Sequence, residues 1–313
     1  MSFDLPLMQS ACATGPVVRI LVTRSAGSVP REAGTSMLVT RSGLNGTIGG
    51  GALELAAITQ ARAMLAGGAA RAHRTMPLGP ALGQCCGGSV NLLWERFTTA
   101  ILPASLPFAR PLGPDGPMPV PVAAQLRMLR AGTAPLERAG WLIEAAPAAA
   151  QPLWIWGAGH VGRALISVLG PMPGLAISWI DTSADRFPLG IPAQVTRIIA
   201  ADPAALVRHA PPDADHVIVT YAHDMDLALC HALLSHGFNS AGLIGSRTKW
   251  ARFRARLGDL GHAPAQIMRI ACPIGDPTLG KHPQVIAVGV AAALLKSAVG
   301  TATLGQDMGD KAG

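Results

Sequence analysis

The sequence contains few aromatic and few charged residues. Phe, Trp and Tyr make up 4% of its 313 residues, charged residues make up 14%, and there is a single Tyr. A protein that binds nucleic acid needs aromatic side chains on which bases stack and clustered basic residues that contact the phosphates. In this chain Arg and Lys are scattered. The net charge of +7 therefore favours anionic partners, and we expect no nucleic acid among them.

Cysteine pairs at metal-binding spacing are missing as well. The five cysteines include no Cys-x-x-Cys pair, and an odd number does not suit a secreted disulfide framework. No basic segment followed by an apolar stretch stands near the start, and the longest apolar helix candidate, 285–295, is too short to span a bilayer. We therefore expect a cytoplasmic protein that does not enter a membrane.

A glycine-rich turn lies in the middle of the chain. Gly157, Gly159 and Gly162 form a Gly-x-Gly-x-x-Gly pattern, which follows the apolar run 153–156 and precedes a helical pattern. A second apolar run ends in Asp181, and this order of elements is typical of dinucleotide-binding units. We expect the turn to hold an anionic cofactor or nucleotide, with Asp181 accepting a hydrogen bond from a ribose hydroxyl. The same glycines also suit a doubly wound domain that binds no nucleotide.

Composition and pattern divide the chain into two domains and two less regular segments. Residues 1–100 are predicted to form a small α/β domain, and residues 152–299 a Rossmann-like, doubly wound parallel sheet. Closely spaced prolines in the first half of residues 101–151 predict a linker, which can hold a short helix at 122–130 and a strand at 140–145. Residues 300–313 are predicted to form a flexible tail. The fold class is therefore α/β.

A second glycine-rich turn is predicted in the N-terminal half. Gly49, Gly50 and Gly51 join a strand to a helix that carries Glu54. Glycines in this number leave the backbone bare, which suits the close approach of a ligand, and a tight helix start explains them equally well.

Two adjacent cysteines lie in a third glycine-rich segment. Cys85 and Cys86 precede Gly87, and a thiolate in such a loop suits a transition metal or sulfur transfer. Neighbouring side chains in an extended segment point in opposite directions, so only one of the two cysteines is expected to face a site. The alternative is a small buried side chain at the start of the next strand.

Polar residues follow two apolar strands of the C-terminal half. His223 comes after one of these strands, and Ser246 and Arg247 come after the next. In a parallel sheet such positions lie at the carboxyl edge, where ligands bind. Together with Lys249, Ser246 and Arg247 suit a phosphate or another oxyanion. For His223, a role in capping the following helix is the alternative.

Together these segments resemble the XdhC/CoxI family, the accessory proteins of xanthine dehydrogenase and related molybdenum hydroxylases. The resemblance covers nearly everything outside the linker and the tail. It rests on the following segments, in this order: Ser25–Arg31, Gly46–Gly51 with Glu54, Cys86–Gly88, Gly157–Gly162, His223–Asp224, Gly245–Arg247 and Pro273–Gly275. One position departs from the pattern, because relatives often have a cysteine directly after the three glycines, where this chain has Ala52.

The resemblance implies a maturation chaperone rather than an enzyme. Such proteins bind the molybdenum cofactor, protect it while sulfur replaces an oxo ligand, cooperate with a cysteine desulfurase and deliver the cofactor to the molybdenum subunit of xanthine dehydrogenase. The glycine-rich segments would then hold the cofactor, and Cys86, or else Cys85, would contact the metal. Alanine-rich helices are compatible with a homodimer.

Two other functions stay open on the sequence alone. The first is an NAD(P)-dependent oxidoreductase, which the fingerprint and Asp181 support, although no convincing proton-donor pair accompanies them. The second is a sulfurtransferase that carries a persulfide on Cys85 or Cys86.

Overall fold

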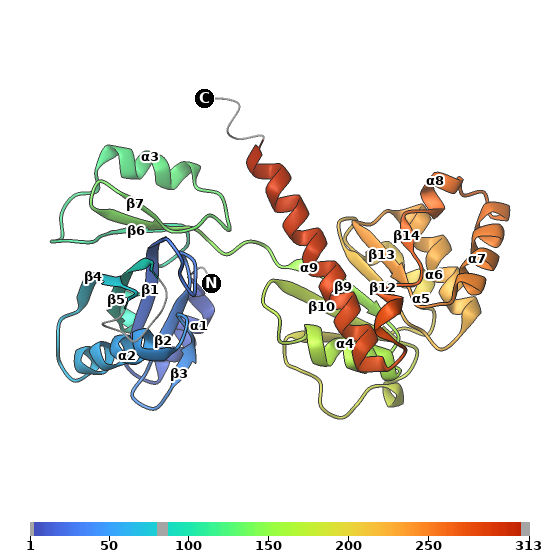
Figure 1. Cartoon of the computed structure of the whole chain (residues 1–313), viewed down its shortest axis with the longest axis horizontal. Helices are drawn as coiled ribbons and strands as arrows, with labels where there is room; N and C mark the ends of the chain where they lie inside the picture. Colours follow the sequence, from blue (N-terminus) through green and yellow to red (C-terminus); the bar gives the residue numbers. More distant parts are fainter. Residues whose placement is uncertain (1–2, 80–86, 308–313) are drawn as a thin grey trace. The chain divides into compact units, whose positions relative to one another are not determined.

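The structure is a computed structural model of the chain and describes residues 3–79 and 87–307. The chain separates into two compact units, residues 1–149 and residues 150–313 (Figure 1). Each unit has its own sheets and its own buried core.

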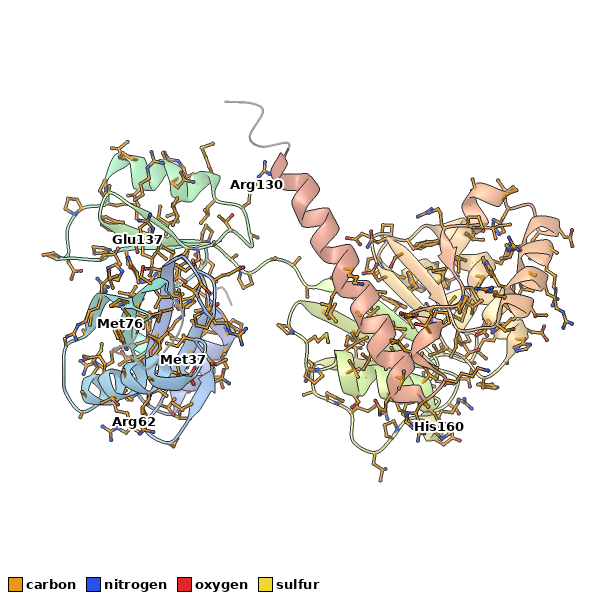
Figure 2. All side chains as sticks on the ribbon, viewed as in Figure 1. Met37, Arg62, Met76, Arg130, Glu137 and His160 are labelled. Atoms are coloured by element: carbon orange, nitrogen blue, oxygen red, sulfur yellow. The ribbon has the colours of Figure 1, made fainter. Side chains whose placement is uncertain are left out.

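The first unit is built on an antiparallel sheet. Its described strands follow the order β3-β2-β1-β5-β4, and helix α2 packs on one face of the sheet. The elements are α1 (Leu5–Ala13), β1 (Val17–Ala26), β2 (Ser36–Val39), β3 (Leu44–Gly46), α2 (Gly51–Leu65), β4 (Arg71–Pro77) and β5 (Ser89–Phe97). Alternate residues of β1, Val18, Ile20 and Val22, lie in the core under α2, together with Met37 of β2 (Figure 2). The helix and the two strands therefore bury one continuous apolar core.

Residues 101–149 are folded, where the sequence predicts a linker. They form β6 (Phe108–Pro111), α3 (Val120–Met128), β7 (Leu136–Arg138) and β8 (Trp141–Glu144), with the strands in the antiparallel order β6-β8-β7. Leu142 of β8 packs against Leu21 and Leu93, on the face of the main sheet opposite α2. The prolines do not mark a linker here. They lie between short elements, in the first turn of α3, or at the end of β6, and Pro is tolerated at all of these positions.

A buried network of charged side chains joins these two sheets. Arg19, the third residue of β1, donates two hydrogen bonds of 2.8 Å to the carboxylate of Glu144. Arg110 pairs with Glu144 at 2.6 Å and also with Glu95. Burial alone would raise the pKa of Glu144, but the charges of Arg19 and Arg110 and their hydrogen bonds outweigh it and lower the pKa to about 2. Glu144 is therefore ionised at neutral pH, and it ties the segment 101–149 to the main sheet.

The second unit is a doubly wound parallel sheet. Across residues 150–307, all of which are described, the strand order is β11-β10-β9-β12-β13-β14. The elements are β9 (Gln151–Trp156), α4 (His160–Leu169), β10 (Leu175–Asp181), β11 (Val195–Ile199), α5 (Pro203–Leu206), β12 (Asp215–Ile218), α6 (His223–His236), β13 (Ser240–Leu243), α7 (Arg247–Asp259), α8 (Pro264–Ile267), β14 (Ile270–Ala271) and α9 (Pro283–Asp307). Helices α4 and α9 cover one face and α6 and α7 the other, as predicted for a Rossmann-like domain.

The direction of strand addition reverses between β9 and β12, so the topological switch point lies there, beside the fingerprint turn. At the other end of the unit, α9 continues to Asp307, where the sequence predicts a flexible tail from Gly300. After Pro283 no further proline interrupts this Ala-rich stretch, which favours continued helix. Residues 308–313 lie outside the described part of the chain. Among the described helices, none is both long enough and apolar enough to cross a membrane.

Candidate functional site

The loop between β1 and β2 contacts two of the three glycine-rich segments singled out in the sequence. A Cβ atom placed on Gly88 would stand 2.4 Å from the carbonyl oxygen of Ser28. A Cβ atom placed on Gly49 would stand 2.7 Å from Cγ of Pro30. Because both approaches are too close for any side chain, the loop brings the triple-glycine turn and the Gly87–Gly88 segment together within the first unit.

The triple-glycine turn satisfies several of its own donors. Gly49, Gly50 and Gly51 have φ angles of +124°, +75° and +64°, a conformation that favours glycine. The carboxylate of Glu54 accepts hydrogen bonds from the backbone amides of Ile48 and Gly50, each at 3.0 Å. The turn is therefore a tight helix start, which was one of the two interpretations made from the sequence. The close approach of a ligand stays a prediction, and it would use the space at the turn rather than these amides.

The protonation state of Glu54 follows from the same contacts. The hydroxyl of Thr47 also donates to this carboxylate, and its oxygen in turn accepts the amide of Gly49 at 3.1 Å. The hydrogen bond from Thr47, joined by those from the turn amides, holds the pKa of Glu54 below its usual value, although partial burial acts in the opposite sense. Glu54 therefore fixes the turn as a carboxylate.

Open surface lies at two of the predicted site residues of the first unit. No heavy atom of the described residues comes within 4 Å of a Cβ position built on Gly50 or on Gly87. The stem of Arg31 passes 3.6 Å from the Cβ position of Gly49, and Arg31 is exposed. A ligand can thus approach bare backbone beside a cation, which fits an anionic guest.

The proposed metal contact cannot be placed. Cys85 and Cys86 lie outside the described residues. Among the residues that are described, no group of three or more His, Cys, Asp or Glu side chains is arranged to hold a metal ion.

In the second unit, the fingerprint glycines occupy the positions that the pattern predicts. Gly157 has a φ of +121°, and a Cβ atom there would stand 2.5 Å from the carbonyl oxygen of Val219. At Gly162 a Cβ atom would meet the Gly157 carbonyl oxygen at 2.0 Å, so the start of α4 packs directly on the turn. Gly159 precedes α4, whose first residue is His160 (Figure 2), and its Cβ position faces open space. Gly159 alone of the three therefore leaves room for a ligand.

The carboxylate of Asp181 is engaged in contacts within the protein. It is 3% exposed, and one carboxylate oxygen accepts the amide of Ala158, in the fingerprint turn, at 2.6 Å. The other oxygen accepts the amide of Thr182 at 2.7 Å and lies 2.6 Å from Nε of Arg186. With these acceptor positions occupied, the geometry does not favour the predicted contact of Asp181 with a ribose hydroxyl. Its role in cofactor binding stays a prediction.

The contact between Arg186 and Tyr221 was not predicted from the sequence. The guanidinium carbon of Arg186 stands 3.9 Å from the ring centroid of Tyr221, which follows β12 and is 60% exposed. This cation–π contact links the ends of β10 and β12 at the switch point. The available signal was that the single Tyr of the chain and an Arg both lie just beyond apolar strands.

His223, Ser246 and Arg247 lie at helix starts on the carboxyl edge, as predicted. His223 and Arg247 are the first residues of α6 and α7, and the Ser246 hydroxyl caps α7 by accepting the amide of Lys249 at 3.1 Å. All three are exposed. No described contact joins them to Asp181, so binding by these residues stays a prediction.

Lys249, which the sequence suggested for the same oxyanion, instead forms a charged pair behind these residues. The ammonium group of Lys249 contacts the carboxylate of Asp226, which is 1% exposed, at 2.5 Å and donates to the Ile244 carbonyl at 3.0 Å. Lys249 is therefore committed within the protein. Burial raises the pKa of nearby Cys230 to about 12 and that of Cys272 to about 11. Both thiols stay protonated at neutral pH, so neither is an activated nucleophile.

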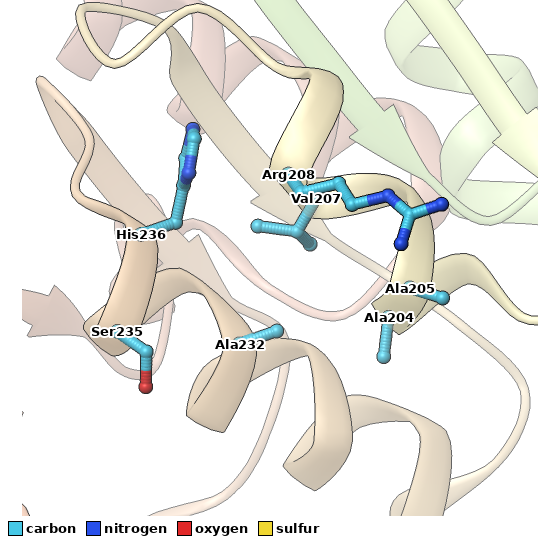
Figure 3. A pocket seen from close by; sticks show the side chains of 7 residues that line it. All are labelled: Ala204, Ala205, Val207, Arg208, Ala232, Ser235 and His236. Atoms are coloured by element: carbon cyan, nitrogen blue, oxygen red, sulfur yellow. The ribbon is translucent and has the colours of Figure 1, made fainter.

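A cavity of about 370 Å³ lies between α5 and the carboxyl end of α6 (Figure 3). Three alanines, a valine, Arg208, Ser235 and His236 line it. None of the predicted site residues does so, and α6 begins at the carboxyl edge and ends here. This cavity is therefore not part of the candidate site.

Two family models match the chain. The model of the XdhC and CoxI family matches residues 11–76, and the model of the XdhC Rossmann domain matches residues 153–294. Together these ranges span more than half of the chain. The chain belongs to the XdhC and CoxI family. Both the triple-glycine turn and the fingerprint turn of this XdhC-family protein lie within the matched residues, whereas Cys85, Cys86 and Gly87 lie between them.

Solved structures agree with this fold. A Bacillus halodurans protein described as a xanthine dehydrogenase is similar over 95% of both chains, with a TM-score of 0.71 and 20% identity, which shows the fold alone. A short-chain dehydrogenase/reductase of Veillonella parvula in complex with NADP aligns with 45% of this chain and 63% of its own at 13% identity. Its TM-score of 0.26 is too low to support an inference. No curated protein matches the chain.

Proposed function

We propose that this protein binds the molybdenum cofactor, shields it during sulfuration and delivers it to the molybdenum subunit of xanthine dehydrogenase. Membership of the XdhC and CoxI family supports a maturation role. The observation that carries the proposal is the contact of one loop with two separate glycine-rich segments, at Ser28 with Gly88 and at Pro30 with Gly49. Two glycine-rich segments that are distant in sequence thereby contact the same loop. One of them, Gly87–Gly88, directly follows Cys86 in the sequence.

The residues present fit an anionic guest. Gly50 and Gly87 leave space that a Cβ atom would fill, Arg31 supplies a positive charge beside Gly49, and Glu54 keeps the turn in shape. Cys86 would provide a soft thiolate ligand for the metal, with Cys85 as the alternative. When bound, the cofactor would supply a molybdenum centre for the recipient enzyme, and the protein's own task is to hold it and exclude water.

Copurification tests the binding step. We expect protein made in cells that synthesise the cofactor to carry molybdenum and pterin in about equal amount to the chain. Cys86→Ala should retain much less molybdenum, whereas Cys272→Ala, which removes a half-buried thiol in the second unit, should retain as much as the wild type. Wild-type protein free of both molybdenum and pterin would contradict the proposal, and equal retention by Cys86→Ala would remove only Cys86 from the site.

Delivery requires partners, which the same preparation tests. We expect the loaded protein to bind the apo form of the molybdenum subunit and a cysteine desulfurase in pull-down assays, and the recipient subunit to gain molybdenum. Transfer of molybdenum without measurable binding to the desulfurase would leave delivery standing and remove that partner. Light scattering on the same sample tests the homodimer.

The oxidoreductase alternative is disfavoured by one observation. Asp181, the acid that should contact the ribose, already accepts from Ala158 and Thr182 and pairs with Arg186. We therefore expect fluorescence titration with NADH to show no saturation in the micromolar range. Micromolar binding together with turnover of a substrate would favour an oxidoreductase instead.

A further inference from the structure

A second possible binding site lies in the first unit, away from the glycine-rich loops. A cavity of about 550 Å³ opens between the start of β4, the end of β5, β6 and the loop that follows β6. Its volume is within the range of small-molecule sites, roughly 300–1,000 Å³. Most of its lining, between residues 95 and 115, is outside the segments matched by the family models.

The lining combines arginines with apolar walls. Arg71 and Arg110 provide the positive charge, whereas Phe97, Phe108 and Pro103 form apolar surface. Two carboxylates also line the cavity. Glu95 is 4% exposed and already pairs with Arg110 and Arg71, whereas Asp115 lies on the exposed loop. Arginine is the side chain best suited to carboxylate and phosphate groups in a partly apolar setting.

Arg110 has a donor to spare. It is 8% exposed; its Nε and Nη2 atoms reach Glu95, and Nη2 also reaches Glu144. Its Nη1 atom is buried and has no hydrogen-bond partner among the described residues. Buried polar groups are nearly always paired, so an unpaired donor on a charged side chain lining a cavity points to an acceptor supplied from outside.

The charges around Arg110 do not balance. Among the described residues, the network holds three cations, Arg19, Arg71 and Arg110, against two carboxylates, Glu95 and Glu144. The side chain of Arg71 is 29% exposed, so its charge is partly open to the solvent at the cavity. Arg96 lies on the other face of β5, where its Nη1 donates to the Met64 carbonyl at 3.4 Å. An anion in the cavity would therefore balance the third cation of the network.

We propose that this cavity binds a small organic oxyanion, a carboxylate or a phosphate ester with an apolar body. The charged end meets Arg71 and Arg110, and the apolar body lies against Phe97 and Phe108. The site is independent of cofactor binding, so either proposal can fail without the other.

Calorimetric titration of the full chain tests the site with four probes: benzoate, phenyl phosphate, inorganic phosphate and benzamide. We expect benzoate or phenyl phosphate, or both, to bind saturably and more tightly than inorganic phosphate, and uncharged benzamide not to bind. The stronger of the two organic anions identifies the preferred oxyanion. Arg71→Gln should weaken its binding by about tenfold or more, since a charged hydrogen-bond donor is lost. Arg74→Gln, an exposed arginine on β4 that does not line the cavity, should bind as the wild type does.

Several results would overturn the proposal. These are no saturable binding of either organic anion, equal binding of benzamide, and wild-type affinity in Arg71→Gln. Inorganic phosphate that binds as tightly as both organic anions would overturn the apolar part. Circular dichroism establishes that each variant is folded. If Arg71→Gln is not, Arg71→Lys replaces it, because Lys keeps the charge beside Glu95 but loses the planar fork of donors.

Discussion

Gly88 lies against the backbone of Ser28 so closely that a Cβ atom on Gly88 would stand 2.4 Å from the Ser28 carbonyl oxygen. The carbonyl oxygen of Ala26 would be 2.6 Å away. Both obstacles are backbone atoms, which cannot rotate aside as a side chain does. The joining of the loop to the cysteine-bearing segment therefore depends on the absence of a side chain at this one residue.

Gly88→Ala should consequently destabilise the first unit by about 1–3 kcal/mol, the usual cost of overpacking. The neighbouring Gly87→Ala is a matched control, because no heavy atom of the described residues lies within 4 Å of its Cβ position. Scanning calorimetry on both variants makes the comparison. Equal stability of the two would show that the loop is not held at Gly88.

The fingerprint turn offers a second matched pair. A Cβ atom on Gly162 would stand 2.0 Å from the Gly157 carbonyl oxygen, whereas that of Gly159 faces open space at an ordinary φ of −72°. We expect Gly162→Ala to destabilise the second unit by at least about 1–3 kcal/mol and Gly159→Ala to leave it unchanged. Urea unfolding measures both. A destabilised Gly159→Ala would mean that this position is packed rather than free for a ligand.

Removing the charge of Glu144 should unfold the first unit more readily. Glu144→Gln leaves Arg19 and Arg110 without their shared carboxylate, and breaking a buried ion pair costs about 3–5 kcal/mol. Glu137→Gln, on neighbouring β7 and more exposed, should change the free energy of unfolding by less than about 1 kcal/mol. Similar losses in the two variants would argue that residues 101–149 are only loosely attached.

His216 predicts how the stability of the second unit depends on pH. Burial first, and the nearby charge of His236 second, lower its pKa from 6.5 to about 4, so it is neutral in the folded protein at pH 5. The unfolded chain binds the proton below pH 6.5, so stability should fall as pH drops from 6.5 towards 4, by up to about 3 kcal/mol.

Urea unfolding at pH 7, 6 and 5 measures this slope. His216→Gln should flatten it, because Gln does not titrate and can still accept from the Trp156 indole, which donates to His216 at 3.1 Å. Substitution of exposed His160 by Gln serves as the control and should leave the slope as it is. An unaltered slope in His216→Gln would assign the pH dependence to other groups.

The C-terminal sheet could be predicted because its strands are buried on both faces and read as short apolar runs between helical stretches. Several strands of the N-terminal half were not predicted. β4 (Arg71–Pro77) is an edge strand, polar along most of its length, so no alternation of apolar residues marks it. In residues 101–149 the helix α3 and the strand β8 were anticipated, but β6 and β7 were not, because the local signal of proline is the same in a linker and between short elements.

The candidate site was predictable as a set of glycines but not as a set of contacts. Spacing identified Gly157 and Gly162, because their roles depend only on the local turn. Asp181 accepts a hydrogen bond from the Ala158 amide and pairs with Arg186. These contacts depend on the side-chain rotamer of Asp181, which no local sequence pattern determines. Arg19 lies within the apolar run of β1, which indicates that it has a buried partner. The sequence does not show that this partner is Glu144.

The pairing of Arg19 with Glu144 also has a consequence for biosynthesis. The two residues are separated by 125 positions, so on a ribosome Arg19 emerges long before the carboxylate that neutralises it. Until then the guanidinium of Arg19 has no carboxylate partner on the face of the five-stranded sheet where the three-stranded sheet will pack. The two sheets can therefore pack together only after nearly half of the chain has been synthesised.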